Sequence, residues 1–138
     1  RSTSSAASDV YKRQGKSFDA LQKIIMTKEI INFEDFLKID MRVGTILEVS
    51  INKKARKPAY VLKIDFGSDI GIKQSSAQIT NYSEAELINK KIVAVCNFEK
   101  KNIAGIVSEV LILGSIDEMN VVHLISARDE AKNGDYIA

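Results

Sequence analysis

Two side chains in the sequence have the chemistry of a nucleophile or a base, Cys96 and His123. Each stands in an apolar, strand-like stretch, Cys96 on one face with Ile92 and Ala94, and His123 inside a Val-Val-His-Leu-Ile segment. Nucleophilic catalysis needs a base beside the nucleophile and a third group that orients the base. Neither residue has such a neighbour in the sequence. We therefore expect both to pack in the core, and we expect no catalytic residue and no enzyme activity.

The sequence also lacks the patterns that hold metals and cofactors. Its Cys and His residues do not have metal-ligand spacing. No glycine-rich phosphate loop is present. The ATP-site signatures of aminoacyl-tRNA synthetases are absent as well, so the chain is not expected to charge a tRNA. We expect no metal site and no cofactor.

A dense group of cations is the first candidate binding feature. Four cations fall within five positions of a polar loop, namely Lys53, Lys54, Arg56 and Lys57. Cations held together in a loop neutralise phosphates and release counterions. Three further cations, Lys73, Lys100 and Lys101, would lie at one mouth of a closed barrel. Solvated surface lysines would have the same composition, and this alternative stays open for both groups.

A change of hydrophobic period shows which elements must position these residues. Asn32 is a cap for a short helix over 33–38 with its phenylalanines facing inward, and a second helix is expected over 17–31. Ser83 and Glu86 form a capping-box pattern that predicts a helix over 83–89. Alternation with period two predicts strands, at 40–51, 60–66, from Ile70 onward, 91–98 and 108–113, with short terminal strands at 121–125 and 136–137.

These elements indicate an all-β fold with minor helices. Five strands with a small helix between the third and the fourth match an OB-fold, a five-stranded Greek-key barrel whose loops and strand faces bind nucleic acids. Gly44, inside the first strand, predicts a bulge or bend. An SH3-like barrel or a small sandwich would give a similar period, so the pattern alone leaves these alternatives open.

Four blocks of the sequence carry a family resemblance. They read IDMRVGTI (39–46), ARKPAYVLKIDFG (55–67), GIKQSSAQIT (71–80) and NFEKKNIAGIVSEVLILG (97–114). In this order they resemble the tRNA-binding-domain family, which includes modules of methionyl-tRNA synthetases and of EMAP-II-like cytokine precursors. The strings ARKPA and IKQSSAQIT are similar to the CsaA branch of export-related chaperones.

The resemblance implies a function as well as a fold. It implies an OB-fold barrel whose terminal extensions form a twofold dimer. It also implies binding of tRNA, or, in the CsaA branch, chaperone-like binding of unfolded preproteins. The alternative is a tRNA-binding module that acts in trans beside an aminoacyl-tRNA synthetase. The expected dimer interface consists of apolar residues near the two termini: Phe33, Phe36, Val121, Leu124, Tyr136 and Ile137.

The resemblance also places a polar run beside the ligand-facing surface. Gln74, Ser75, Ser76 and Gln78 carry amides and hydroxyls that can bond to base edges or to a peptide backbone. A polar rim of the barrel is the alternative. Asn97 and Ser108 belong to the fourth block, and we expect them either to contact the ligand or to hold the neighbouring loop.

The first residues differ from the rest in composition. Residues 1–14, RSTSSAASDVYKRQ, are rich in Ser and Ala and resemble an assembly scar, whereas Met26 opens a segment that reads like a native start. We expect 1–25 to be a non-native, disordered leader and 26–138 to be a single domain. The leader holds five of the 20 Lys and Arg and two of the 18 acidic residues, so 26–138 keeps 15 basic and 16 acidic groups, a net charge of −1.

This charge leaves only local clustering to support nucleic-acid binding. A single Cys and the lack of a secretory signal fit a reducing cytosol, so we expect a cytoplasmic protein. The apolar run at 110–113 is far too short to span a bilayer, so we expect no membrane insertion.

Overall fold

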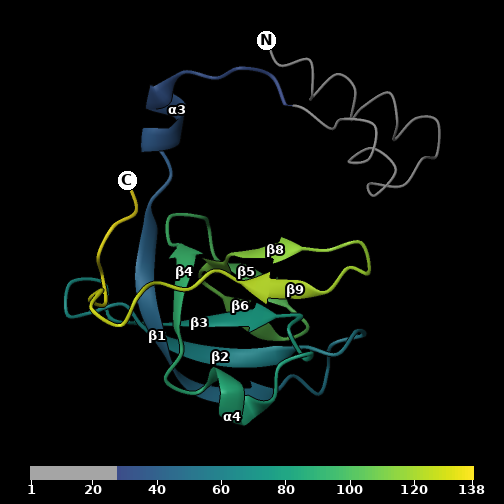
Figure 1. Ribbon diagram of the computed structural model, residues 1–138. Helices are drawn as coiled ribbons and strands as arrows, with labels where there is room; N and C mark the ends of the chain where they lie inside the picture. The colour runs from purple at the N-terminus through teal and green to yellow at the C-terminus, as the bar shows by residue number, and fades with distance from the viewer. Residues whose placement is uncertain (1–27) are drawn as a thin grey trace, which may run out of the picture. The chain divides into compact units, whose positions relative to one another are not determined.

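The computed structural model describes residues 28–138 (Figure 1). The predictions for the leader, and for most of the helix over 17–31, lie outside the described residues. Residues 28–31 are described and are not helical, so the end of that predicted helix is wrong. The chain divides into two compact units, Arg1–Leu37 and Lys38–Ala138. The strands all belong to the second unit.

In the first unit the predicted short helix is present as α3, Phe33–Leu37. Its orientation was predicted wrongly, because α3 has no buried residue and the Phe33 side chain is 71% exposed. The Phe33 and Phe36 rings stack on each other with centroids 6.0 Å apart. A five-residue helix is too short to bury two aromatic rings in a core by itself.

The second unit is built on a strongly curved antiparallel sheet, as Figure 1 shows. Its strand order is β3-β2-β1-β4-β7, and the barrel is nearly closed, as an OB-fold requires. The five strands are β1 (Met41–Ile51), β2 (Tyr60–Asp65), β3 (Ile72–Ala77), β4 (Lys91–Val95) and β7 (Leu111–Ile112). The all-β prediction with minor helices is confirmed.

Two small hairpins complete the barrel. They are β5 (Lys101–Ile103) with β6 (Ile106–Ser108), and β8 (Gly114–Ile116) with β9 (Val122–Leu124). Of their four strands the sequence predicted one, the short strand at 121–125, which is confirmed as β9. Because of the hairpins, the strands predicted at 91–98 and 108–113 are shorter than expected. The backbone beyond Val95 leaves the sheet to form the β5–β6 hairpin and rejoins it only at Leu111.

The long strand β1 bends so that it pairs with two partners. Its first half pairs with β4 and its second half with β2, and the register shifts at Leu47, between Ile46 and Glu48. Gly44 is not the bulge that was expected. A Cβ atom there would lie 2.6 Å from the Ile64 side chain and 2.7 Å from that of Phe66, so this glycine allows the core to pack against the strand backbone.

The core lies inside this curve. Its fully buried side chains include Ile46, Leu62, Ile64, Phe66 and Ile92, and Leu87 of helix α4 (Glu84–Leu87) is added to them. The predicted capping box of α4 is confirmed, because the Ser83 hydroxyl accepts a bond from the Glu86 N–H and the Glu86 carboxylate accepts one from the Ser83 N–H. The bond from the Ser83 N–H to the carboxylate is the largest cause that lowers the pKa of Glu86.

The C-terminal segment pairs with the free edge of β1. Val43 donates to the Asp135 carbonyl (2.9 Å) and accepts from the Gly134 N–H (2.8 Å), and Ile137 donates to the Met41 carbonyl (2.9 Å). Asn133 and Gly134 form a turn. Gly134 has a φ of +93°, and a Cβ there would lie 2.6 Å from the Phe66 carbonyl oxygen, so only glycine fits.

Candidate binding site

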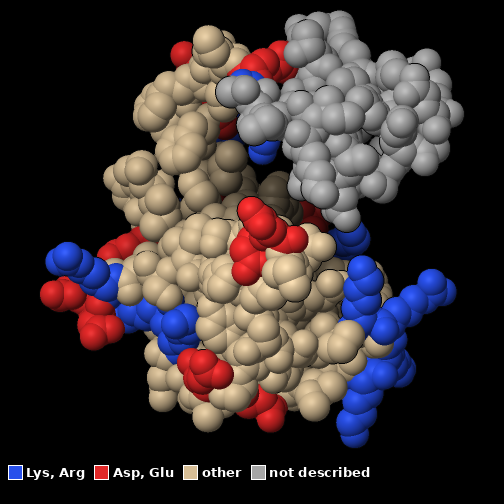
Figure 2. Space-filling view, turned by 45° about the vertical axis from the view of Figure 1, so that its right-hand side comes forward, with Lys and Arg blue, Asp and Glu red and all other residues tan. Residues whose placement is uncertain are grey.

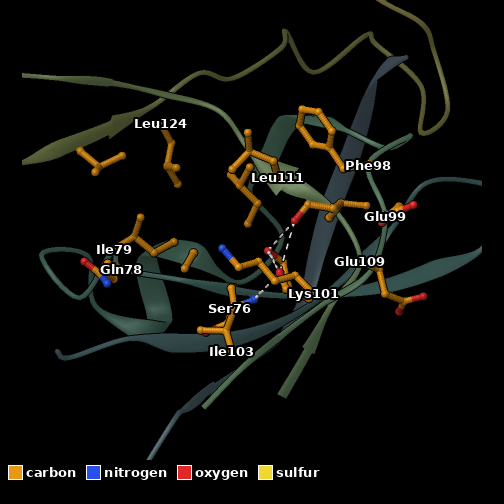
Figure 3. A pocket seen from close by; sticks show the side chains of 16 residues that line it. Ser76, Gln78, Ile79, Phe98, Glu99, Lys101, Ile103, Glu109, Leu111 and Leu124 are labelled. Atoms are coloured by element: carbon orange, nitrogen blue, oxygen red, sulfur yellow. Dashed lines mark hydrogen bonds between the residues drawn. The ribbon is translucent and has the colours of Figure 1, made fainter. Parts of the chain in front are cut away.

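A pocket of about 410 Å³ opens where β3 and β7 fail to meet. Its exposed lining is mostly apolar and comes from segments far apart in the chain, namely Ile79, Phe98, Ile103, Val110, Leu111, Ile112, Val122 and Leu124. Three charged side chains, Glu99, Lys101 and Glu109, also line the pocket. Figure 3 shows Ile79 and Leu124 on one side and Phe98 on the other, with the Lys101 side chain reaching between them. Phe98 is 58% exposed and Leu111 is 50% exposed, so this apolar surface is open to solvent.

Two buried serines close the barrel beneath the pocket. Ser75 is 1% exposed and Ser108 is 8% exposed. The Ser75 hydroxyl donates to the Val110 carbonyl (3.0 Å), and the Ser108 hydroxyl oxygen accepts from the Ser76 N–H (3.2 Å). The hydroxyls therefore join β3 to the segment after β6. Ser76 presents a half-buried side chain to the pocket.

We expect the Ser75→Ala substitution to lower the free energy of unfolding by about 0.5–1.5 kcal/mol, because it removes the shorter of the two hydroxyl bonds to the buried Val110 carbonyl and leaves only the 3.5 Å bond from Ser108. Ser76→Ala is the matched control, and it should change stability by less than about 0.5 kcal/mol. Urea denaturation of the two variants measures the difference. Equal stabilities would show that the Ser75 hydroxyl does not hold β3 in place.

Glu109 organises a second polar cluster on the outer side of β3. Its carboxylate accepts from the Gln74 main-chain N–H (3.0 Å) and lies 3.9 Å from the Lys73 ammonium and 3.6 Å from that of Lys100. Gln74 also donates from its side chain to the Val107 carbonyl (3.2 Å). These three predicted site residues therefore share one carboxylate, which reduces the positive charge that Lys73 and Lys100 can offer a ligand.

The basic loop lies between β1 and β2, and all four of its cations are exposed, Lys53, Lys54, Arg56 and Lys57. Its start is fixed to the β5–β6 hairpin, because Asn52 donates to the Ile103 carbonyl (3.5 Å). A Cβ at Gly105 would lie 3.5 Å from the Lys54 side chain, which places the Lys54 stem against the hairpin turn. In Figure 2 a group of Lys and Arg side chains projects from the right-hand edge of the barrel, with no acidic side chain among them.

The β5–β6 hairpin thus connects the two candidate surfaces. It contributes Lys101 and Ile103 to the apolar pocket and supports the basic loop on its other side. Among the described residues Lys101 has no ion pair. The predicted cations of the loop and of the hairpin are therefore neighbours in the fold.

Asn97 lies away from both surfaces. Its side chain accepts from the Asp40 N–H (2.9 Å) and donates to the Lys38 carbonyl (2.7 Å), so it fixes the backbone that enters β1. Beside it, Arg42 donates to the Asp40 carboxylate at 2.5 Å. The two side chains form an ion pair.

Cys96 and His123 lie in different environments. Cys96 is half-buried, as predicted, and burial raises the pKa of its thiol to about 11, which leaves little reactive thiolate at neutral pH. The prediction for His123 is wrong, because its side chain is 56% exposed. In β9 the alternation turns Val122 and Leu124 inward and His123 outward.

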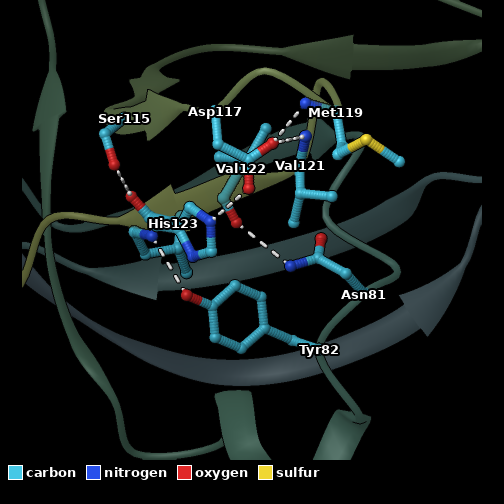
Figure 4. Close-up of polar contacts among 9 residues, drawn as sticks. Asn81, Tyr82, Ser115, Asp117, Met119, Val121, Val122 and His123 are labelled. Atoms are coloured by element: carbon cyan, nitrogen blue, oxygen red, sulfur yellow. Dashed lines mark hydrogen bonds and ion pairs between the residues drawn. The ribbon is translucent and has the colours of Figure 1, made fainter.

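His123 pairs with Asp117, as Figure 4 shows, with Nε2 and Oδ2 2.8 Å apart. Asp117 also accepts from the N–H groups of Met119 (2.8 Å) and Val121 (3.0 Å), and these bonds lower its pKa, with the His123 bond the largest cause. Asp117 therefore orders the turn between β8 and β9. No group of three residues able to hold a metal ion occurs among residues 28–138.

Two residues that the sequence did not single out attach β9 to the barrel. Asn81 donates to the Val122 carbonyl and the Tyr82 hydroxyl accepts from the Leu124 N–H, each at 3.0 Å (Figure 4). They fix the strand that supplies Val122 and Leu124 to the pocket. Leu124, expected at a dimer interface, lines the pocket, whereas Val121 lies in the turn before β9.

Known proteins match the second unit. Residues 41–136 match the family of tRNA-binding domains. The CsaA chaperone protein of Picrophilus torridus superposes with a TM-score of 0.75 and 58% identity, covering 79% of this chain and 100% of its own. The chaperone CsaA of Bacillus anthracis superposes with a TM-score of 0.75 and 49% identity, covering 80% of this chain and 100% of its own.

Methionine–tRNA ligases match the same part of the chain. The enzyme of Thermococcus onnurineus is 36% identical over 102 residues, which are 73% of this chain and 14% of the enzyme. The chain therefore spans about one seventh of the length of these curated relatives. None of the helices within residues 28–138 has the length and apolar character that a bilayer crossing requires.

Proposed function

Because the chain belongs to the tRNA-binding-domain family and resembles its CsaA chaperones, we propose that it is a binding protein that captures unfolded preprotein segments in the cytoplasm. It acts without catalysis of its own. The observation that carries this proposal is the solvent-open pocket between β3 and β7, whose exposed lining is mostly apolar.

The dimensions and chemistry of the pocket fit an unfolded segment better than a nucleic acid. A volume of about 410 Å³ holds two or three apolar side chains. Apolar burial stabilises such a complex by about 25 cal/mol per Å². Folded proteins present few contiguous apolar residues, so a pocket of this kind selects unfolded ones.

A double substitution of Phe98→Glu and Leu111→Glu tests the proposal. We expect it to weaken capture of an unfolded client by about tenfold, because a charged group replaces each half-exposed apolar side chain that would pack against the client. Suppression of the thermal aggregation of a model client provides the measurement, with tRNA affinity recorded in parallel.

The matched control is the pair Ile116→Glu and Met119→Glu on the β8–β9 hairpin. These side chains are 67% and 82% exposed and do not line the pocket, and the change in charge is the same. If the two double variants lose capture equally, the pocket is not the client site.

Binding of tRNA is the second candidate function, and the basic loop favours it. All four loop cations are exposed, and none of them has an ion pair among the described residues. The same chain would then act in trans beside an aminoacyl-tRNA synthetase, which is the alternative that the synthetase relatives suggest. The two functions use different surfaces and are compatible.

We further propose a homodimer. Apolar side chains near the two ends of the described chain stay exposed, among them Phe33 and Tyr136, each 71% exposed. A twofold contact would bury them. Sedimentation equilibrium at micromolar concentration should give about twice the chain mass of 15.3 kDa, whereas a mass of one chain would rule the dimer out.

A further inference from the structure

The pocket is bordered by a strand whose outer edge is open. β3 is an end strand of the five-stranded sheet, and β7 is the other end strand. Beyond Ala77 the main chain of β3 continues along the pocket through Gln78 and Ile79. An open strand edge is a row of main-chain donors and acceptors, and it is a template for pairing with another chain.

The hydrogen bonds show which groups of β3 face this edge. The Glu109 N–H donates to the Gln74 carbonyl (2.8 Å), and the Ser76 N–H donates to the Ser108 hydroxyl (3.2 Å). Residues alternate along a strand, so the main chains of Gln74, Ser76 and Gln78 point away from β2. The Ser108 hydroxyl thus accepts the Ser76 N–H bond that a neighbouring strand would otherwise accept. No group among the described residues does the same for the Gln78 N–H.

Past that point the edge has no partner within residues 28–138. The Ser76 carbonyl and both main-chain groups of Gln78 take part in no hydrogen bond with the described residues. On the other end strand, β7, the main chain of Ile112 also faces away from its neighbouring strand. Leu113 donates to the Val93 carbonyl (2.9 Å), so the alternation turns the main chain of Ile112 away from β4.

We propose that the pocket receives an extended polypeptide segment as an added strand beside β3. The segment pairs its main chain with the Ser76 carbonyl and the Gln78 N–H, and its apolar side chains, at alternate positions, enter between Ile79 and Leu124. This inference rests on the proposed capture of unfolded preproteins and specifies its mode. The main-chain bonds give affinity without regard to sequence, and the pocket selects apolar residues at every second position.

An extended polypeptide can bond to the open edge of β3 and can also fill the apolar pocket. The open edge requires amide donors and carbonyl acceptors at strand spacing, which RNA does not offer. The walls require apolar side chains next to those amides. The Lys101 ammonium at the rim, which has no ion pair among residues 28–138, can bond to a further peptide carbonyl.

The test uses a seven-residue peptide of alternating Val and Ser flanked by lysines, with a fluorescent label, titrated against the full chain. Two derivatives carry N-methyl groups on alternate residues. One is methylated at the odd positions and the other at the even positions, and these are the two registers. Each derivative keeps all its side chains and loses the N–H groups on one edge of the extended peptide. We expect methylation in one register to weaken binding at least tenfold. Sensitivity in both registers would also support the proposal, with the strand inserted between β3 and Ile112.

If the unmodified peptide binds and neither methylated register weakens it, capture is by side chains alone and the added-strand inference is overturned. If the unmodified peptide does not bind, the proposed function itself fails. Displacement of the bound peptide by total tRNA would assign the pocket to RNA instead and would also overturn the inference.

A variant of the protein gives a second, independent readout. Gln78→Pro removes the main-chain donor, whereas Gln78→Ala keeps it and removes only the exposed side chain. We expect about a tenfold loss of peptide affinity for the proline variant and no loss for the alanine variant. If both variants fold and bind the peptide with equal affinity, the Gln78 N–H has no role in binding. If the proline variant does not fold, the N-methylated peptides decide the question.

Discussion

We expect a fourfold alanine substitution in the β1–β2 loop to weaken tRNA binding by about a hundredfold at low salt and to flatten its salt dependence. The substituted residues are Lys53, Lys54, Arg56 and Lys57. Removing one phosphate contact lowers the slope of log affinity against log salt by about 0.7–0.9, so four contacts account for a change of up to about 3.6. Fluorescence anisotropy with total tRNA across a salt series measures both quantities.

The expectation follows from where charge is available in the structure. Residues 26–138 carry 15 basic and 16 acidic groups, so no general positive field attracts RNA. Lys73 and Lys100 share the Glu109 carboxylate. The exposed loop cations have no such partner among the described residues, so they are the main source of phosphate contacts.

Two controls separate a local effect from a loss of net charge. Lys100→Ala with Lys101→Ala should flatten the slope less than the loop variant does. Arg128→Ala with Lys132→Ala removes two exposed charges near the C-terminus, away from the loop and the pocket, and should leave the slope unchanged. If the loop variant keeps the affinity and slope of the parent while client capture also persists, the loop is only a solvated surface.

The features that the sequence predicted correctly depend on local pattern. The period of two located β1 and β2 almost to the residue, because one face of each strand packs in the core. Ser83 and Glu86 located α4, because a capping box is satisfied within four residues.

The features that the sequence missed depend on contacts between distant segments. Ser75 was a candidate ligand contact, yet it is buried and bonds to the Val110 carbonyl. Ser108, for which a loop-holding role was the alternative, is also buried and accepts from the Ser76 N–H. The pocket wall depends on Tyr82, which holds β9 from 42 positions away. Phe98 and Leu111 come to line the pocket because the chain inserts the β5–β6 hairpin between the paired strands β4 and β7, and no local pattern predicts that insertion.

Removal of the C-terminal segment should lower stability more than the Ser75→Ala substitution does. We expect removal of residues 131–138 to lower the free energy of unfolding by about 3–6 kcal/mol, at about 1 kcal/mol for each hydrogen bond removed and more for apolar packing. The bonds removed include the three main-chain bonds to Met41 and Val43 and the bond from the Thr45 hydroxyl to the Asn133 side chain (2.7 Å). A small domain has only about 5–15 kcal/mol in total, so this destabilisation is severe.

If the truncated chain does not fold, the Asn133→Ala substitution provides a second, less destabilising variant for the same stability measurement. It removes only the bond to Thr45 and should cost about 1 kcal/mol. Urea denaturation at two protein concentrations tenfold or more apart then locates the stabilisation. If the segment acts by pairing with β1 of its own chain, the difference between parent and variant does not change with concentration.

A difference that grows with protein concentration would instead place the stabilisation between chains, because only dissociation makes stability depend on concentration. Tyr136 makes both outcomes physically reasonable. Its main chain forms a bridge with Arg42 of its own chain, and the Arg42 guanidinium lies 5.9 Å from the centre of its ring. Yet the side chain remains 71% exposed, so the outer face of the ring is free to meet a second copy. The concentration series therefore separates the intrachain and dimer contributions of the C-terminal segment.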